Sequence, residues 1–249
     1  MEFLEKNGKQ IGILAALALV VGFLVTFLVS RSQNAETKIQ DKMAQVELEY
    51  SKYKENFAKV STPEVETKQD PKVTLELIAE KQKKADELLK LKETVITSRK
   101  KISDDLLKFM NENPKTISSQ MAALYLSDLM IDENKKTEAL DVLKKSSSNG
   151  SDLTSILVSK KIGSLLADAN QCEDAIKVWD RIVANKKAQF AHAETKIMQS
   201  LCYQKNNDLK KAEDLLISVK NDKTEGSAEF VQRAEKILRL IQFKKSIGS

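Results

Sequence analysis

Residues 126–143 read LSDLMIDENKKTEALDVL, and the same pattern of side chains returns twice later in the chain. Residues 162–179 read IGSLLADANQCEDAIKVW, and residues 199–216 read QSLCYQKNNDLKKAEDLL. In each copy a large residue and a small one precede an Asn, an Ala follows the Asn by five residues, and a bulky apolar residue ends the copy. The shared positions are Leu126, Ser127, Met130, Asn134, Ala139 and Leu143; Ile162, Gly163, Leu166, Asn170, Ala175 and Trp179; and Gln199, Ser200, Tyr203, Asn207, Ala212 and Leu216.

The spacing of these copies predicts an array of helical hairpins. The shared Ala recurs after 36 and then 37 residues, and self-similarity at that period is typical of stacked helix pairs. Small residues let two helices approach closely, and Asn tolerates the left-handed backbone conformation that ends a helix. Each copy is therefore expected to be a helix, a tight turn and a second helix. The copies resemble the tetratricopeptide repeat, and such arrays bind other proteins far more often than they catalyse reactions.

The composition favours an all-α fold. Only 7 Gly and 3 Pro occur in 249 residues, so few residues interrupt long helices. Charged residues make up 31% of the chain with a net charge of +5, and the interleaved signs indicate solvated helix surfaces rather than a nucleic-acid interface. Two Cys and one His cannot complete the usual four-ligand zinc site. We expect no nucleic-acid partner, no metal and no cofactor.

Residues 11–30, after a short tail at 1–10, form the uncharged apolar segment IGILAALALVVGFLVTFLVS. At ~1.5 Å per residue this segment matches the ~30 Å hydrocarbon core of a bilayer. It is longer than the apolar region of a cleavable signal peptide, which has roughly 7–15 residues. We therefore expect one N-terminal transmembrane helix. Basic residues flank both of its ends, so charge alone does not determine the topology.

Residues 31–60 are expected to form a polar helix with one apolar stripe. The stripe recurs at gaps of four and three and consists of Ile39, Met43, Val46, Tyr50, Tyr53, Phe57 and Val60. Such a stripe serves either a coiled coil, which would make a homo-oligomer through residues 39–60, or a helix that packs on its own chain. Tyr and Phe are bulky for a two-stranded coil, which favours packing within the chain.

The remaining chain divides by its turn signals. Residues 61–71 are a polar linker with two Pro, and residues 72–114 are a long helical segment whose apolar stripe includes Leu89, Val95 and Ile96 and which Asn113-Pro114 stops. Residues 115–225 hold the three degenerate repeats. Residues 226–249 are expected to form a helix that caps the array, because repeat arrays need a terminal element over the last apolar face.

The tetratricopeptide resemblance also implies a binding groove. In that family the first helix of each repeat lines a concave surface that receives a partner segment. Alignment on the shared Ala carries these positions onto Met121, Leu124, Asp128, Ile131, Leu157, Lys160, Ile197 and Leu201. Apolar residues with charged neighbours suit an amphipathic or unfolded segment. The alternative is that the chain's own upstream helices cover these residues.

No residue combination points to catalysis. His192 has no nucleophile or acidic cluster beside it in the sequence, Trp179 stands where the repeat requires a core aromatic residue, and no phosphate-binding loop occurs. Cys172 and Cys202 belong to successive repeats, on the edge of the array that carries the turns. Their Cα atoms can therefore come within the roughly 4.4–6.8 Å that a disulfide needs. Two small, separate buried side chains are the commoner explanation for such a pair, and a disulfide in an oxidising compartment is the alternative.

The whole layout resembles the YfgM-type ancillary subunits of the SecYEG translocon. The similarity rests on the amino end EKNGKQIG (residues 5–12), the single apolar span, the polar helix with tyrosines and the diverged repeats after Asn113-Pro114. The resemblance implies a bacterial inner-membrane protein with its C-terminal domain in the periplasm, which links the export channel to periplasmic chaperones or newly translocated proteins. One alternative is a cell-envelope scaffold that oligomerises through residues 39–60 in division, secretion or pilus assembly. Another is an adaptor that faces the cytoplasm.

Overall fold

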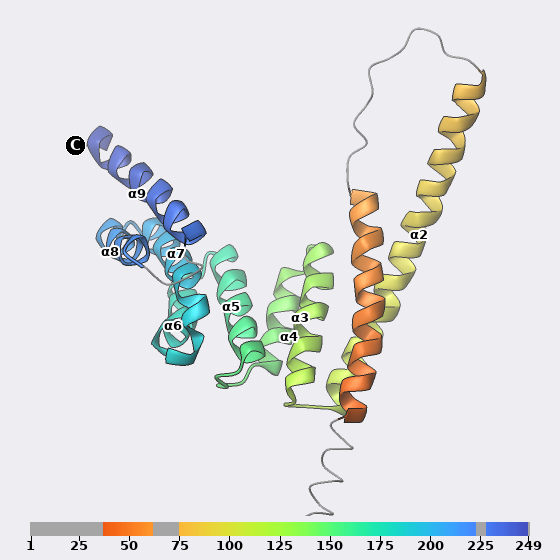
Figure 1. The fold of residues 1–249 in the computed structure, drawn as a ribbon, viewed down its shortest axis with the longest axis horizontal. Helices are drawn as coiled ribbons and strands as arrows, with labels where there is room; N and C mark the ends of the chain where they lie inside the picture. The colour runs from red at the N-terminus through yellow and green to blue at the C-terminus, as the bar shows by residue number, and fades with distance from the viewer. Residues whose placement is uncertain (1–36, 62–74, 223–227, 249) are drawn as a thin grey trace, which may run out of the picture. The chain divides into compact units, whose positions relative to one another are not determined.

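The computed structural model describes residues 37–61, 75–222 and 228–248, and every regular element in these ranges is a helix. The chain divides into two units, residues 1–48 and residues 49–249. The segment 37–61 is helical, and the labelled helices follow it (Figure 1). They are α2 (Leu75–Glu112), α3 (Ile117–Asp132), α4 (Lys136–Ser146), α5 (Leu153–Asp168), α6 (Cys172–Ala184), the short 3₁₀ helix η1 (Lys186–Ala188), α7 (Gln189–Lys205), α8 (Leu209–Lys220) and α9 (Ala228–Gly248).

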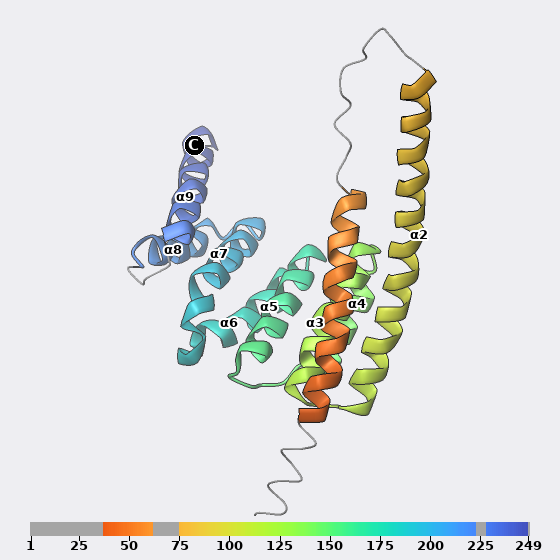
Figure 2. The same ribbon diagram turned by 45° about the vertical axis from the view of Figure 1, so that its right-hand side comes forward.

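Six of these helices form three successive hairpins, as the repeat spacing predicts. Helix α3 packs on α4, α5 on α6, and α7 on α8. Each hairpin also packs on the next, because α5 contacts both α3 and α4, and α6 contacts α7 (Figures 1 and 2). The prediction of stacked helical hairpins is therefore confirmed for the residues from α3 to α8.

The turn inside each hairpin confirms the role predicted for the repeated Asn. The three turn residues adopt positive φ values, namely Asn134 (62°), Asn170 (62°) and Asn207 (61°). In the first turn the N–H of Asn134 donates to the carbonyl of Ile131 at 2.9 Å, and the N–H of Lys135 donates to that of Met130 at 2.8 Å. The other two turns repeat this pair of bonds. The pair defines a Schellman C-cap, which satisfies carbonyls that a helix end otherwise leaves open.

The repeated small and bulky residues form the contact between the two helices of each hairpin. The shared Ala residues are fully buried, and so are the residues that end each copy. In the second hairpin a Cβ placed on Gly163 would overlap the indole ring of Trp179, which is 1% exposed. Glycine is therefore required at this position by the close approach of Trp179. The expected core role of Trp179 is confirmed.

The third repeat departs from the pattern at Gln199, and the structure explains the departure. Gln199 is 3% exposed, and its Nε2 donates to Oδ1 of Asp180 on α6 at 2.7 Å. A buried amide is stable only when it is hydrogen-bonded. This hydrogen bond satisfies the buried Nε2 of Gln199 and links the third hairpin to the second.

A side-chain network holds the loop between α4 and α5. The hydroxyl of Ser155 lies 2.8 Å from that of Ser148, 2.9 Å from Oε1 of Gln120 and 2.6 Å from Oδ2 of Asp152. Gln120 Nε2 also donates to Ser148 at 3.1 Å. The N-cap of α5 is Asp152, whose Oδ1 accepts the N–H of Ser155 at 2.9 Å. A Cβ on Gly150 would overlap both Asp152 and Ser155. The loop is therefore closely packed at this position, and Gly150 leaves room for both side chains.

The long helix before the repeats ends where the sequence predicts, since α2 stops at Glu112 ahead of Asn113-Pro114. It packs on α3, and Ile102, Leu106 and Phe109 are buried. The stripe predicted further upstream is only partly correct. Val95 is buried, but Leu89 is 58% exposed and Ile96 is 64% exposed.

At the other end of the array, α9 packs on α8 and α7. Its buried face carries Ala234, Leu238 and Ile241. These residues share a core with Ile197 of α7 and Leu216 of α8. The helix therefore covers the last hairpin, as expected of a capping element.

The segment predicted to cross the membrane, residues 11–30, lies outside the described residues. Of the helices that the structure describes, none combines the length and the hydrophobicity that crossing a bilayer demands. The transmembrane helix therefore stays a prediction from the sequence.

Candidate functional site

The residues predicted to line a groove come from the first helix of each hairpin, namely α3, α5 and α7. Most of them are half-buried; these are Met121, Leu124, Asp128, Ile131, Leu157 and Lys160. Two differ strongly from this, because Ile197 is fully buried while Leu201 is 40% exposed.

The prediction that Ile197 lines an open groove is wrong, because its side chain is fully buried. It lies in the core formed by α7, α8 and α9, with Leu216, Leu238 and Ile241. Helix α9 occupies the side of α7 against which a fourth hairpin would otherwise stack. A residue that faces the next repeat inside the array thus becomes a core residue at its end.

On the first hairpin, two tyrosines of the segment 37–61 contact two aspartates of α3, Asp128 and Asp132. Tyr50 Oη donates to Oδ2 of Asp128 at 3.3 Å, and Tyr53 Oη lies 3.4 Å from Oδ2 of Asp132. The Tyr50 ring stacks on Tyr125 with 4.5 Å between centroids. An open groove at Asp128 is therefore not supported, and the alternative interpretation, cover by an upstream helix, is correct there.

Helix α2 completes this contact. Arg99 Nε donates to Tyr53 Oη at 3.0 Å, and the Arg99 guanidinium lies 5.7 Å from the ring centroid of Phe57. Tyr53 is 1% exposed. The stripe residues from Tyr50 to Phe57 therefore pack on their own chain, which favours the intramolecular interpretation of this part of the stripe over a coiled coil.

The two tyrosines are fixed as hydrogen-bond donors. Burial, followed by the negative charge of Asp128, raises the pKa of Tyr50 well above its ordinary value. Burial also raises the pKa of Tyr53, although the hydrogen bond from Arg99 acts in the opposite direction. Both hydroxyls keep their protons at neutral pH and donate to carboxylates.

Ion pairs join successive hairpins across the same face. Lys161 Nζ lies 2.7 Å from Asp128 Oδ1, and Lys160 Nζ lies 2.5 Å from Glu194 Oε2. Partly exposed pairs of this kind contribute only ~0–1 kcal/mol each. They neutralise one another's charge, so Lys160 is paired within the chain rather than free for a partner.

An exposed apolar row lies at the start of the same three helices. We define the apolar row as Ile117, Leu153 and Phe190, which are 57%, 57% and 56% exposed. Each stands 22 residues before the Ala shared by the repeats. Since first helices of packed hairpins lie roughly 8–10 Å apart, the row spans about 20 Å.

Sequence reasoning missed the apolar row, although the alignment that identified the groove residues would have found it. The row lies one turn before Met121 and Leu157, on the same side of α3 and α5, because residues four apart share a helix face. Helix α9 buries Ile197 completely. No described helix buries the three side chains of the apolar row in this way, since all three are more than half exposed.

The structure brings the two cysteines together. Cys172 is the first residue of α6, and Cys202 lies near the end of α7. Their Cα atoms are 5.2 Å apart and their sulfur atoms are bonded. The bond joins the second hairpin to the third and sits in the shared core with Leu166 and Ile176.

Reduction of this disulfide is expected to lower the free energy of unfolding by about 3–4 kcal/mol, because the bond closes a loop with a sequence separation of 30. Denaturant titration of the full chain with and without reductant measures the change. The matched control is the double variant Cys172→Ser and Cys202→Ser, which should not respond to reductant. Two reactive thiols in the untreated, denatured protein would contradict the bond.

Little in the described residues resembles a catalytic centre. His192 Nε2 lies 3.0 Å from the carbonyl oxygen of Asn185, at the N-terminal end of α7. Within the same residues, no three metal-ligating side chains from His, Cys, Asp and Glu gather around one point.

Comparison of the chain with protein-family models, with curated proteins and with solved structures found no match.

Proposed function

We propose that this chain is a membrane-anchored, non-enzymatic scaffold that binds other proteins through its array of tetratricopeptide-like hairpins. The observation that carries the proposal is the apolar row. Three large apolar side chains are more than half exposed at equivalent positions of stacked hairpins. Repetition of an exposed apolar residue at one offset indicates a surface kept for contact rather than scattered exposure.

The occupant that fits this row best is an incompletely folded protein segment. An extended chain rises about 3.3 Å per residue, so six or seven residues would cover roughly the 20 Å of the row. Half-buried Met121 and Leu157 continue the apolar surface by one turn. Newly translocated proteins present such segments before they fold.

Two further observations support the proposed location. The apolar segment 11–30 supplies the anchor. The disulfide between Cys172 and Cys202 is the kind of bond that persists in an oxidising compartment such as the periplasm. Both agree with an inner-membrane protein whose hairpins face the periplasm, next to the export channel as in the SecYEG-associated family that the sequence resembles.

The alternative scaffold, which oligomerises through residues 39–60, has weaker support. Tyr53 and Phe57, two residues of the required seam, contact Arg99 of their own chain. A coiled coil through these positions would have to separate them from α2.

The test uses the full chain in neutral detergent and a fluorescently labelled, reduced and carboxymethylated protein as an unfolded probe. Changing Leu153 and Phe190 to Glu is expected to weaken binding of the probe about tenfold, because two charges would then be desolvated at the interface. Fluorescence anisotropy measures the affinity, and circular dichroism checks that helicity is kept.

The matched control changes Leu89 and Ile96 of α2 to Glu. These side chains are as exposed as the apolar row but lie outside the hairpins, so affinity should stay within about twofold of the unmodified chain. Equal losses in both double variants, or no binding by the unmodified chain, would refute the proposed role of the row.

A further inference from the structure

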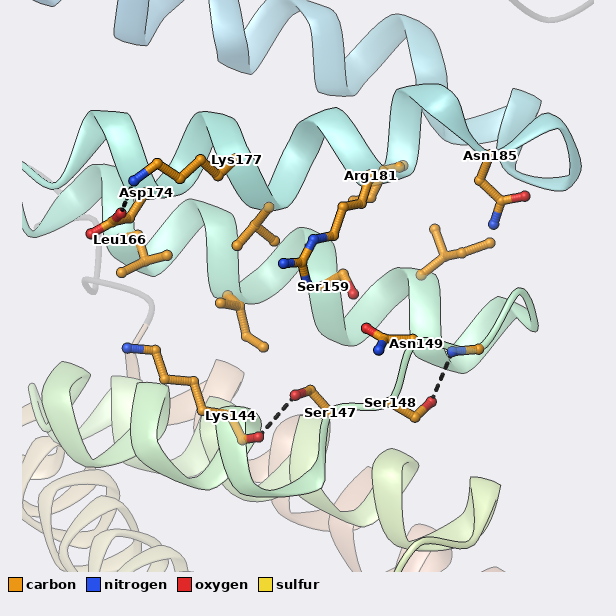
Figure 3. A pocket seen from close by; sticks show the side chains of 15 residues that line it. Lys144, Ser147, Ser148, Asn149, Ser159, Leu166, Asp174, Lys177, Arg181 and Asn185 are labelled. Carbon is orange, nitrogen blue, oxygen red and sulfur yellow. Dashed lines mark hydrogen bonds and ion pairs between the residues drawn. The ribbon is translucent and has the colours of Figure 1, made fainter.

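A second surface lies between the second helices of the first two hairpins. It is a hollow of about 690 Å³ bounded by α4, α5, α6 and the loop that follows α4. Figure 3 shows Lys144 extending from α4 and Arg181 from α6, with residues of α5 between them, while Lys177 lies along α6 with its nitrogen at Asp174. We call this surface the basic cleft.

The basic cleft carries unbalanced positive charge. Its lining includes Lys144, Lys177 and Arg181 but one carboxylate, Asp174. That carboxylate already accepts from Lys177 at 2.9 Å. Among the described residues, neither Lys144 nor Arg181 has an acidic partner within ion-pair distance. Lys160 and Lys161 of α5 are paired within the chain, whereas the exposed cations Lys144 and Arg181 can pair with carboxylates of a partner.

Hydrogen bonds hold one wall of the basic cleft in place. The network of Ser148, Ser155, Gln120 and Asp152 holds the loop on one side. Gln120 and Ser155 are 3% and 1% exposed. A surface held in place before binding loses less conformational entropy when a partner docks.

The floor of the basic cleft is apolar. Ile156, Ile162 and Leu166 of α5 lie beneath it and are only 3–6% exposed, and half-buried Val178 of α6 adjoins them. The cations therefore stand on opposite sides of an apolar strip instead of converging on one point. That arrangement fits a chain with carboxylates along its edges and apolar side chains between them better than it fits a single small anion.

We propose that the basic cleft binds an acidic segment of a protein partner whose apolar residues lie on the α5 floor. The carboxylates of the segment pair with Lys144 and Arg181, and the apolar residues between them contact Val178 and the adjoining floor. The inference rests on the proposed scaffold function. Neither Leu153 nor Phe190 lines the cleft, so the two surfaces can be tested separately.

The experiment measures binding of a fluorescein-labelled peptide of repeated Leu-Glu-Glu units to the full chain in neutral detergent. The double change K144E and R181E should weaken binding by at least about tenfold, since attraction becomes repulsion on both walls. The milder pair K144Q and R181Q should weaken it to a smaller extent. A Leu-Gln-Gln peptide should bind the unmodified chain at least about tenfold less tightly than the acidic peptide.

The matched control is K210E with K236E, which changes the net charge equally at exposed lysines of α8 and α9. An equal loss in this control would reduce the effect to general electrostatic attraction and overturn the proposal. Failure of the unmodified chain to bind the acidic peptide would also overturn it. So would displacement of the peptide by mixed micelles of the same detergent with phosphatidylglycerol at matched charge, because the site would then recognise lipid headgroups. None of these results would alter the expected loss for the Leu153 and Phe190 variant.

Discussion

Ile197→Glu is expected to unfold the C-terminal part of the array. Ile197 is 0% exposed and lies among Leu216, Leu238 and Ile241. A carboxylate there has no cation within its core, and an uncompensated buried charge costs about 3–5 kcal/mol. Denaturant titration of the full chain, followed by circular dichroism, should show a correspondingly earlier transition.

Leu201→Glu is the matched control for this prediction. Leu201 lies one turn further along α7 and is 40% exposed, so its change to Glu should alter the free energy of unfolding by less than about 0.5 kcal/mol. If Ile197→Glu were as stable as the unmodified chain, the third hairpin would carry an open groove at Ile197 after all.

Trp179→Ala is expected to lower the free energy of unfolding by about 3–5 kcal/mol. The indole is 1% exposed and packs directly over Gly163. Removal of the ring leaves a cavity that the two helices of the second hairpin cannot close, since their separation is set by other buried contacts such as Ala175. Chemical denaturation of the full chain measures the loss.

The effect of Gly163→Ala on the free energy of unfolding is expected to change sign when Trp179 is replaced by Ala. In the unmodified chain the new Cβ would overlap the indole ring of Trp179, which should cost about 1–3 kcal/mol. In the Trp179→Ala background the ring is gone, and Ala should stabilise the helix by about 0.5–1 kcal/mol relative to Gly. The double-mutant cycle measures the interaction energy between positions 163 and 179, apart from the effect of each single substitution. Additive effects would contradict the close approach of Gly163 to Trp179.

Much of the hairpin array could be predicted because its signals are local. A left-handed turn residue, a close-contact Ala and a bulky partner each follow from the backbone geometry of one hairpin. Asn170, Ala175 and Trp179 therefore carry the same information in the sequence as in the structure.

The candidate binding residues could be predicted only in part, because their exposure depends on distant segments. Asp128 is covered by Tyr50, which is 78 residues away. Ile197 is covered by Leu238 and Ile241 of α9. Helical periodicity places a residue on a face, but it does not say which other helix covers that face.

The sequence by itself determined the all-helical class, the three hairpins and the position of each turn, because these depend on residues within about 40 positions of one another. It also placed the two cysteines on one edge of the array. Only the tertiary structure decided that Tyr50 and Tyr53 cover the first hairpin, that Ile117, Leu153 and Phe190 stay exposed, and that Lys144 and Arg181 line opposite sides of one cleft. The physical reason is that burial and charge pairing are set by which helices pack together, and those contacts join residues far apart in the chain.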